Sequence, residues 1–109
     1  MMQEIEARND IDDNGNPTGG YVKATGFSIN WQNGPLGRGV GRQEANGAFV
    51  EGVVEAARQR IAFYQSASGG KFACKENASA LVCLERALLH LNARTQAREK
   101  REVEGTHVP

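Results

Sequence analysis

Two arginines near the end of the chain, Arg94 and Arg98, are the residues whose type and spacing best fit a chemical role. They lie four positions apart, so on a helix they occupy one face, a single turn from each other. A guanidinium group binds phosphate through two parallel hydrogen bonds and also stacks on flat bases. The pair predicts an anion site on a helix, although a solvated helix end with cations that favour the helix dipole explains the same residues.

A second group of candidate ligand-binding residues lies earlier in the chain, where a helical pattern begins. Phe72 offers an aromatic face for stacking, Lys75 a positive charge, and Asn77 an amide for hydrogen bonds to base edges. The start of a helix also favours a bound anion. These residue types together fit a ligand that combines phosphate with a base.

An acidic segment, Asp10–Gly15, matches the opening positions of an EF-hand calcium loop. The match fails at the twelfth position, where Tyr21 stands in place of the bidentate glutamate, and Pro17 interrupts the loop. We therefore interpret the segment as an acidic turn.

Three alternating glycines, Gly37, Gly39 and Gly41, suggest a phosphate-cradling loop. Neither a GxGxxG turn within a βαβ unit nor a Gly-Lys-Ser/Thr ending is present. The favoured interpretation is a flexible connector, and the alternative is a loop in which Arg38 and Arg42 close over an anion.

The potential metal ligands and nucleophiles do not form a recognisable site. Their spacing matches no zinc motif, and no serine or cysteine has a base at a suggestive distance in the sequence. We therefore expect no metal, no cofactor and no catalytic residue, which indicates a binding protein rather than an enzyme. The residues considered are Cys74, Cys83, His90 and His107.

The charge of the chain is balanced overall, with thirteen basic and thirteen acidic residues. Because affinity for nucleic acid rises with the number of phosphates neutralised, this balance argues against DNA or RNA as a partner. The bases concentrate instead in a strip at 85–101, which suits a small anion. No apolar run approaches the ~20 residues of a membrane span, and residues 1–6 lack the features of a signal peptide. We expect a protein that contacts no membrane and stays in the cytoplasm where it is made.

The length of 109 residues predicts one domain. The order of the expected elements, a strand region followed by two helices, predicts the α+β class. Residues 1–20 are acidic and rich in turn formers, which predicts a loop, with a short strand at 3–7 before it. The alternation of Phe27, Ile29 and Trp31 with polar residues predicts a strand within 21–33 that has one buried face.

A glycine-rich connector over 34–45 separates that strand from a predicted helical hairpin over 46–102, and residues 103–109 read as a tail. The second helix is expected to be the longer one, so its basic end should project beyond the first, with both arginines directed away from the apolar seam. One apolar face is predicted for each helix, from Phe49, Val50, Val53, Val54, Ala57, Ile61 and Tyr64 in the first and Leu81, Leu84, Leu88 and Leu91 in the second. A strand and a hairpin are too thin to hide their apolar faces in one chain, which predicts a homodimer or homohexamer.

Three stretches of the chain, in this order, resemble a known family. They are Ile29–Pro35, Lys71–Ala78, and Leu91–Arg98 running into Val103–Thr106. The order is similar to that of the phage Thoeris anti-defence family, whose domain ends in a helical hairpin and is shared with an anti-CBASS family.

The resemblance implies a protein that binds a cyclic nucleotide messenger of bacterial immunity and holds it without degrading it, in the cytoplasm of the infected host. In the family the messenger is a glycocyclic ADP-ribose held at a dimer interface, and some members form hexamers that take up cyclic di- or trinucleotides at separate pockets.

The ligand-binding set that the resemblance implies contains the hairpin-start asparagine, Asn77, and the paired arginines, Arg94 and Arg98. It is completed by Gly105 and Thr106 from the last matching stretch, beside Phe72 and Lys75, the second of which is often arginine in the family. The alternative function is a helical-hairpin adaptor, in which the arginines pair with acidic side chains of another protein.

Overall fold

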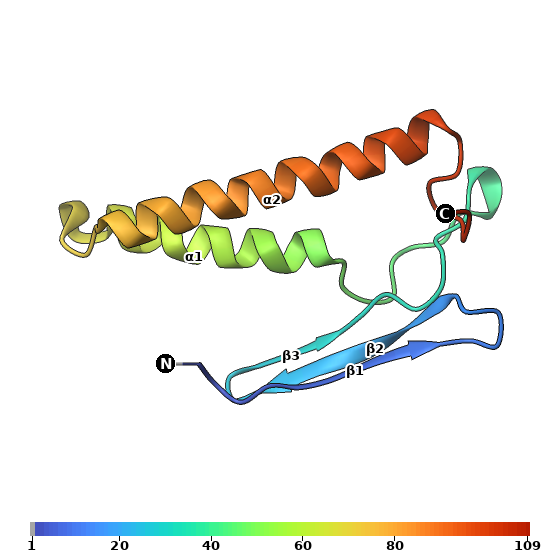
Figure 1. The fold of residues 1–109 in the computed structure, drawn as a ribbon, viewed down its shortest axis with the longest axis horizontal. Coiled ribbons are helices and arrows are strands. Elements are labelled where there is room, and N and C mark those ends of the chain that lie inside the picture. Colours follow the sequence, from blue (N-terminus) through green and yellow to red (C-terminus); the bar gives the residue numbers. More distant parts are fainter. Residues whose placement is uncertain (1) are drawn as a thin grey trace. The chain divides into compact units, whose positions relative to one another are not determined.

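The computed structural model describes residues 2–109, and these form two compact units. One unit is Met1–Phe49 with Arg101–Pro109, and the other is Val50–Lys100. Strands come first and a two-helix hairpin follows, which confirms the predicted α+β class (Figure 1). The elements are β1 (Glu6–Ile11), β2 (Pro17–Ala24), β3 (Phe27–Asn30), a short 3₁₀ turn (Gly39–Gly41), α1 (Val50–Gly70) and α2 (Lys75–Lys100).

The three strands form an antiparallel meander in the order β1-β2-β3. The prediction that residues 1–20 form a loop was therefore wrong in part, because half of that segment pairs as β1 and the start of β2. Two of the acidic residues that suggested a loop, Glu6 and Asp10, lie on this strand, whose side chains are largely exposed, so that charge is tolerated there. The strand predicted at 3–7 lies later in the chain than expected, since β1 begins at Glu6.

The loop in this region is confined to the turn between β1 and β2, and Asp12 organises it. One carboxylate oxygen of Asp12, Oδ1, accepts the backbone N–H groups of Asn14 at 2.9 Å and Asn16 at 3.0 Å. The hydrogen bonds from the backbone N–H groups of Asn16 and Asn14 hold the pKa of Asp12 below its usual range. Gly15 takes a φ of 78°, a conformation that glycine adopts at no steric cost. The EF-hand-like segment is thus an acidic hairpin turn.

The single strand expected over 21–33 is divided in the structure. A tight turn after Ala24 separates β2 from β3, and β3 ends at Asn30. The alternation of Phe27, Ile29 and Trp31 reflects an amphipathic strand only in part, because Ile29 and Trp31 are half-buried while Phe27 is exposed.

Residues that follow the sheet fold back onto its last strand through backbone and amide groups. The backbone N–H of Ala48 donates to the carbonyl of Asn30 at 2.7 Å, and the N–H of Gln32 donates to the carbonyl of Ala48 at 3.0 Å. The Asn46 side chain binds both the N–H and the carbonyl of Asn33. The predicted helix start near residue 46 was wrong because this stretch is extended and paired, and α1 begins only at Val50.

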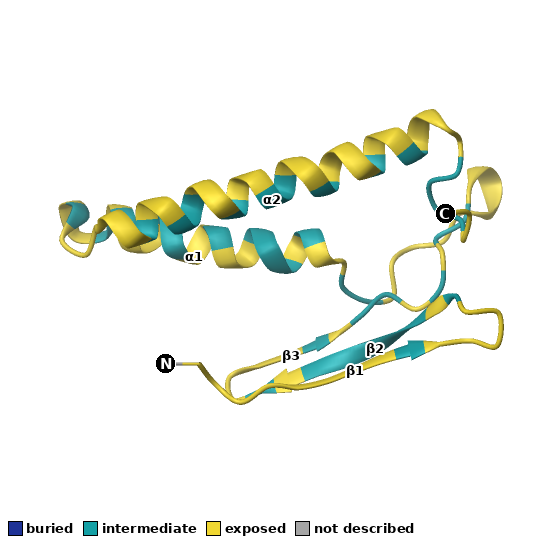
Figure 2. Ribbon diagram, viewed as in Figure 1, coloured by how far each residue is buried: buried dark blue, intermediate teal, exposed yellow. Residues whose placement is uncertain are grey.

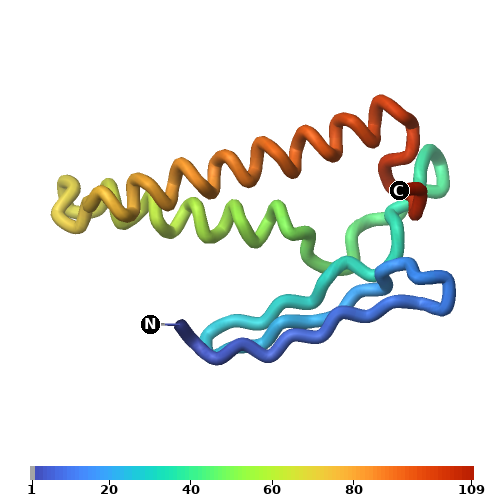
Figure 3. The backbone as a smooth tube through the Cα atoms, in the orientation of Figure 1, coloured from blue at the N-terminus to red at the C-terminus, as the bar shows by residue number. Residues whose placement is uncertain are grey.

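The second unit is the antiparallel hairpin of α1 and α2. The regular part of α1 ends where Ala67 turns to a ψ of 143° and Ser68 to a φ of 53°, close to the predicted end. The Gln65 side chain fastens the connection, because its amide donates to the carbonyl of Cys74 at 3.1 Å and accepts the N–H of Cys74 at 2.9 Å. The last residues of α2 run on past the start of α1 (Figure 3), as the sequence predicts.

Burial in the hairpin follows one face of each helix (Figure 2). The half-buried stripe of α2 contains the predicted leucines, Leu81, Leu84, Leu88 and Leu91. The single apolar face predicted for the first helix was wrong in part, since Val54 and Ile61 are half-buried whereas Phe49, Val50 and Tyr64 are exposed. Within residues 2–109 no side chain is fully buried.

The backbone pairing of residues 46–48 with the end of the sheet can be tested by substituting two glycines, Gly47 within the paired stretch and Gly52 outside it. A Cβ on Gly47 would lie 2.6 Å from the carbonyl carbon and oxygen of Trp31, whereas a Cβ on Gly52 in α1 would meet nothing within 4 Å. We expect Gly47→Ala to lower the free energy of unfolding by about 1–3 kcal/mol through this clash. Gly52→Ala should raise it by about 0.5–1 kcal/mol through helix propensity. Denaturant midpoints of both variants check this, and equal effects of the two would contradict the pairing described for Gly47.

Candidate functional site

Arg94 lies on α2 opposite the first turn of α1. One terminal nitrogen, Nη2, donates to Oε1 of Glu51 at 3.3 Å, and this is the one hydrogen bond of the Arg94 side chain within residues 2–109. The Arg94 side chain is 65% exposed and that of Glu51 is 33% exposed. Most donors of this guanidinium group therefore face solvent, at the point where α2 begins to extend past α1.

Arg98 occupies a different position from the one expected. It is half-buried and continues the helical stripe of Leu84, Leu91 and Thr95, whereas Arg94 lies to one side of that stripe. The prediction that both arginines project away from the seam was therefore wrong for Arg98. A spacing of four residues puts both arginines on one broad face of α2. The half-buried stripe on that face is narrow, so that it includes Arg98 but not Arg94.

The second group of predicted residues lies at the other end of α2. Phe72, in the connection before the helix, is 58% exposed, and Nζ of Lys71 lies 5.4 Å from the centre of its ring. Lys75 begins α2, and the backbone N–H of Asn77 donates to Sγ of Cys74 at 3.4 Å. An exposed ring, a cation and a helix start are thus brought together at this tip of the hairpin.

The two groups do not form one pocket within a single chain. An α-helix rises by about 1.5 Å per residue, so Lys75 and Arg94 are separated by about 28 Å along α2. The expectation that Arg94 and Arg98 hold phosphates while Phe72 stacks a base of the same ligand is therefore wrong for one copy of the chain. A straight helix cannot fold back to bring its ends together.

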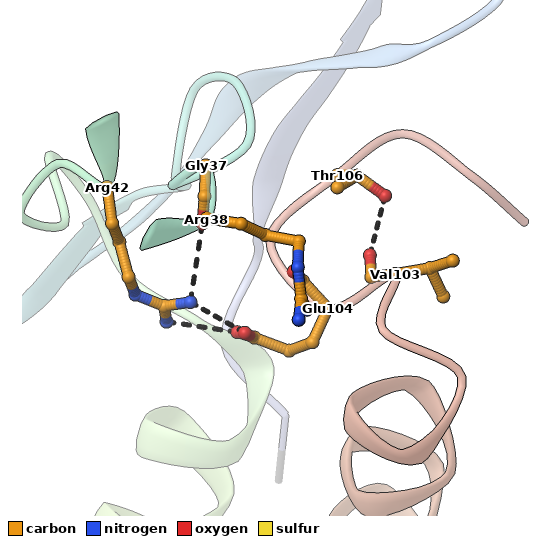
Figure 4. A network of polar contacts seen from close by, with 6 residues as sticks. All are labelled: Gly37, Arg38, Arg42, Val103, Glu104 and Thr106. Atoms are coloured by element: carbon orange, nitrogen blue, oxygen red, sulfur yellow. Dashed lines mark hydrogen bonds and ion pairs between the residues drawn. The ribbon is translucent and has the colours of Figure 1, made fainter. Parts of the chain in front are cut away.

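The remaining candidates, Gly105 and Thr106, belong to the first unit. The N–H of Gly37 donates to the carbonyl of Gly105 at 2.8 Å, and Gly105 has a φ of 80°. Thr106 Oγ1 donates to the carbonyl of Val103 (Figure 4), and the N–H of Val108 donates to Thr106 Oγ1 at 3.2 Å. The predicted tail is therefore an ordered segment whose residues 103–106 are half-buried.

An ion pair joins this segment to the glycine-rich loop. Nη1 and Nη2 of Arg42 reach the two carboxylate oxygens of Glu104 at 2.6 and 3.0 Å, and Arg38 donates to the Glu104 carbonyl at 3.1 Å (Figure 4). The prediction of a flexible connector was wrong because these bonds fix the loop. Of the two arginines in the alternative interpretation, only Arg42 binds an anionic group, the carboxylate of Glu104, whereas Arg38 binds the backbone carbonyl of that residue.

Sequence reasoning missed the acidic partners of the arginines. Glu51 and Glu104 are far from Arg94 and Arg42 in the sequence, and no helical spacing connects them. The only signal for Glu104 was its place in the Val103–Thr106 stretch. Local pairs were easier to foresee, such as Glu55 with Arg58 three residues later, a contact that lowers the pKa of Glu55 to about 2.

A further cationic cluster lies on α1. The Arg60 guanidinium carbon is 5.1 Å from the centre of the Phe63 ring and 4.9 Å from that of Tyr64, and Nε of Arg60 donates to the Tyr64 hydroxyl at 3.2 Å. Both rings are exposed.

Residues 2–109 contain no cluster of three potential metal ligands, and no described helix is long and apolar enough to span a membrane.

Comparison with known proteins identifies a phage relative. The chain is 41% identical, over 80 residues that make up 73% of its length, to "Thoeris anti-defense 1" of Bacillus phage SBSphiJ7. The chain spans about half the length of that curated relative, since the match covers 51% of it. No family model matches. The similarity confirms the resemblance to the Thoeris anti-defence family that the sequence motifs indicate.

The Arg42–Glu104 pair predicts a local change in amide exchange. Arg42→Gln removes the ionic contact with Glu104, so the segment that includes Gly105 should open more often and expose the Gly37 N–H. We expect hydrogen exchange at Gly37 to accelerate about fivefold, the upper range for a partly exposed ion pair. Arg38→Gln, which removes one bond to a carbonyl, serves as the control and should have a smaller effect. Unchanged exchange in Arg42→Gln would show that the pair does not hold the segment.

Proposed function

We propose that this homologue of the phage Thoeris anti-defence proteins binds a nucleotide-derived immune messenger and holds it intact in the cytoplasm of the infected bacterium. The proposed ligand is glycocyclic ADP-ribose, with cyclic oligonucleotides as further candidates from the resemblance to an anti-CBASS family. The observation that carries the proposal is the exposed guanidinium group of Arg94, held by one contact of 3.3 Å. The name of the relative supports a role against Thoeris defence.

The site that we propose is shared by two copies of the chain. A ligand that uses both the tip residues and the arginines cannot bridge about 28 Å along one helix. Two hairpins side by side in opposite directions bring the tip of one, with Phe72, Lys75 and Asn77, to the α2 end of the other, with Arg94 and Arg98. A homodimer is the smallest such assembly, and a homohexamer built from dimers contains the same contact.

The absence of full burial in the described residues supports this assembly. Folded chains of this size normally enclose some apolar side chains completely. Here the exposed apolar residues include Phe63 and Phe72 in the hairpin, and their burial between copies would stabilise a dimer.

Sequestration rather than conversion is proposed because of the chemistry of the candidate residues. Guanidinium, ammonium, amide and phenyl groups bind phosphate and bases, but none of them is a ready nucleophile or a general base at neutral pH. A messenger bound by such groups is withdrawn from its effector while its covalent bonds stay intact.

A second candidate function, a helical-hairpin adaptor for another protein, is favoured by one observation. The exposed cluster of Arg60, Phe63 and Tyr64 consists of residue types that are enriched at protein interfaces. In this case the arginines of α2 would pair with acidic side chains of the partner.

One experiment separates the two functions. The protein is incubated with glycocyclic ADP-ribose and a panel of cyclic di- and trinucleotides, the free ligand is measured, and the complex is then heated to release what was bound. Sequestration requires depletion of a ligand that is recovered unchanged after heating. A product that accumulates with time and with protein concentration would instead indicate a hydrolase, and no depletion of any ligand would favour the adaptor.

Arg94 provides a residue-level prediction. Hydrogen bonds to a charged group contribute about 1.5–3 kcal/mol, so Arg94→Ala should weaken messenger binding by about ten- to a hundredfold in calorimetry. Arg98→Ala should weaken binding to a similar degree and should also lower the thermal midpoint, because Arg98 is half-buried and has contacts of its own.

The matched control is Arg86→Ala, which removes the same charge from an exposed position of α2. It should leave affinity close to that of the unchanged protein. If Arg86→Ala and Arg94→Ala weaken binding equally, the effect comes from net charge, and the assignment of Arg94 to the site is wrong.

A further inference from the structure

We infer that Glu51 is an internal competitor of the ligand, which lowers the affinity of Arg94 for anions and selects those with enough charge to displace it. The inference rests on the proposed function, in which Arg94 contacts phosphate. Glu51 is absent from the predicted ligand-binding residues and lies on α1, which contains none of them.

The geometry of the Glu51–Arg94 pair is that of an exchangeable contact. It consists of one hydrogen bond of 3.3 Å between Nη2 and Oε1, and the arginine side chain is 65% exposed. The Arg42–Glu104 pair differs in each respect, with two hydrogen bonds of 2.6 and 3.0 Å, an arginine that is 41% exposed and a glutamate that is 22% exposed. The same two side-chain types thus form a fixed contact in one unit and a loose one in the other.

Chemistry decides which anion takes the place of Glu51. A single exposed contact between a carboxylate and a guanidinium group is weak, because water screens both charges. A phosphate group with two oxygens aligned to the guanidinium fork binds more strongly than one carboxylate oxygen. A diphosphate can therefore displace Glu51, while a singly charged ligand gains little over the existing contact.

Displacement does not remove the charge of Glu51, because the residue is fixed in the first turn of α1. Its carboxylate stays near the bound anion and repels it. Glu51 consequently lowers affinity in two ways, by occupying Arg94 in the free protein and by repulsion in the complex.

The test is Glu51→Gln, which keeps the size of the side chain and removes the charge. Two unit charges about 4 Å apart in water interact enough to change a binding constant about fivefold, so we expect messenger affinity to rise by about that factor. Glu85→Gln, at an exposed position of α2 about 14 Å along the helix from Arg94, is the control for net charge and should change affinity by less than about twofold, since water and salt screen a charge at that distance. In an Arg94→Ala background, Glu51→Gln should give a clearly smaller gain, because only the repulsion between Glu51 and the bound anion is then removed, and an equal gain in both backgrounds would contradict the competition for Arg94.

A second arm uses inorganic pyrophosphate as the probe, so that the result does not depend on the messenger. The ¹⁵N NMR signal of Arg94 Nε is followed while pyrophosphate is added to the full chain and to Glu51→Gln, and the thermal midpoint of each is recorded. A rise of about fivefold in pyrophosphate affinity at Arg94 supports the inference, and singly charged acetate should show a weaker response in both proteins.

The outcomes of the two arms distinguish the inference from the proposed function. If pyrophosphate affinity at Arg94 is unchanged or lower in Glu51→Gln, the inference is overturned, and a fall would identify Glu51 as a residue that positions Arg94. If pyrophosphate affinity rises while no messenger binds to either protein, the inference stands for Arg94 as an anion site and the proposed function fails.

Discussion

The length of α2 is the constraint on which the proposed site depends. Its 26 residues form a rod of about 39 Å, and the candidate residues are divided between the two ends of that rod. At one end an aromatic ring, a lysine and an amide lie around the start of the helix. At the other end Arg94 faces the first turn of α1, and Arg98 lies one helical turn further along. The tip supplies stacking, charge and hydrogen bonding but no guanidinium fork to bind a phosphate through two hydrogen bonds, and the opposite end supplies the forks without an aromatic ring among the candidate residues. The proposed site shared by two copies of the chain rests on this separation more than on any single contact.

Arg42 and Arg94, each paired with a glutamate distant in the sequence, show that the same two side-chain types can form contacts of different strength. Arg42 donates hydrogen bonds to Glu104 from both terminal nitrogens and thereby connects the glycine-rich loop to residues 103–106, so its role is structural. Arg94 touches Glu51 with one nitrogen and keeps its other donors in solvent. A side chain already satisfied by two short bonds has little to gain from a ligand, whereas a loosely paired one has much to gain. This difference, rather than the number of basic residues, indicates where an anion would bind.

The sequence predicted the features that depend on local periodicity. The hairpin, the end of α1, the leucine stripe of α2 and the greater length of α2 follow from spacing within each helix, and the structure has them. The sheet was predicted poorly because β1 pairs through its backbone, and its acidic side chains suggest a loop. The loop at Gly37 was predicted to be a flexible connector and the segment at Gly105 to be a tail, for a related reason. Their order comes from Glu104 and from a backbone bond between residues far apart in the chain, which no local pattern reveals.

The most direct test of the shared site mixes two variants that are each defective at a different end of α2. Arg94→Ala and Asn77→Ala proteins are prepared separately, where each should bind little messenger, and are then co-expressed so that mixed dimers form. If the tip of one copy and the arginines of the other make up the site, a mixed dimer has one intact site of two. Since about half of the dimers are mixed, about a quarter of the binding capacity of the unchanged protein should return. If the mixture binds no more than the separate variants do, the tip and the arginines of different copies do not combine, and the shared site is wrong.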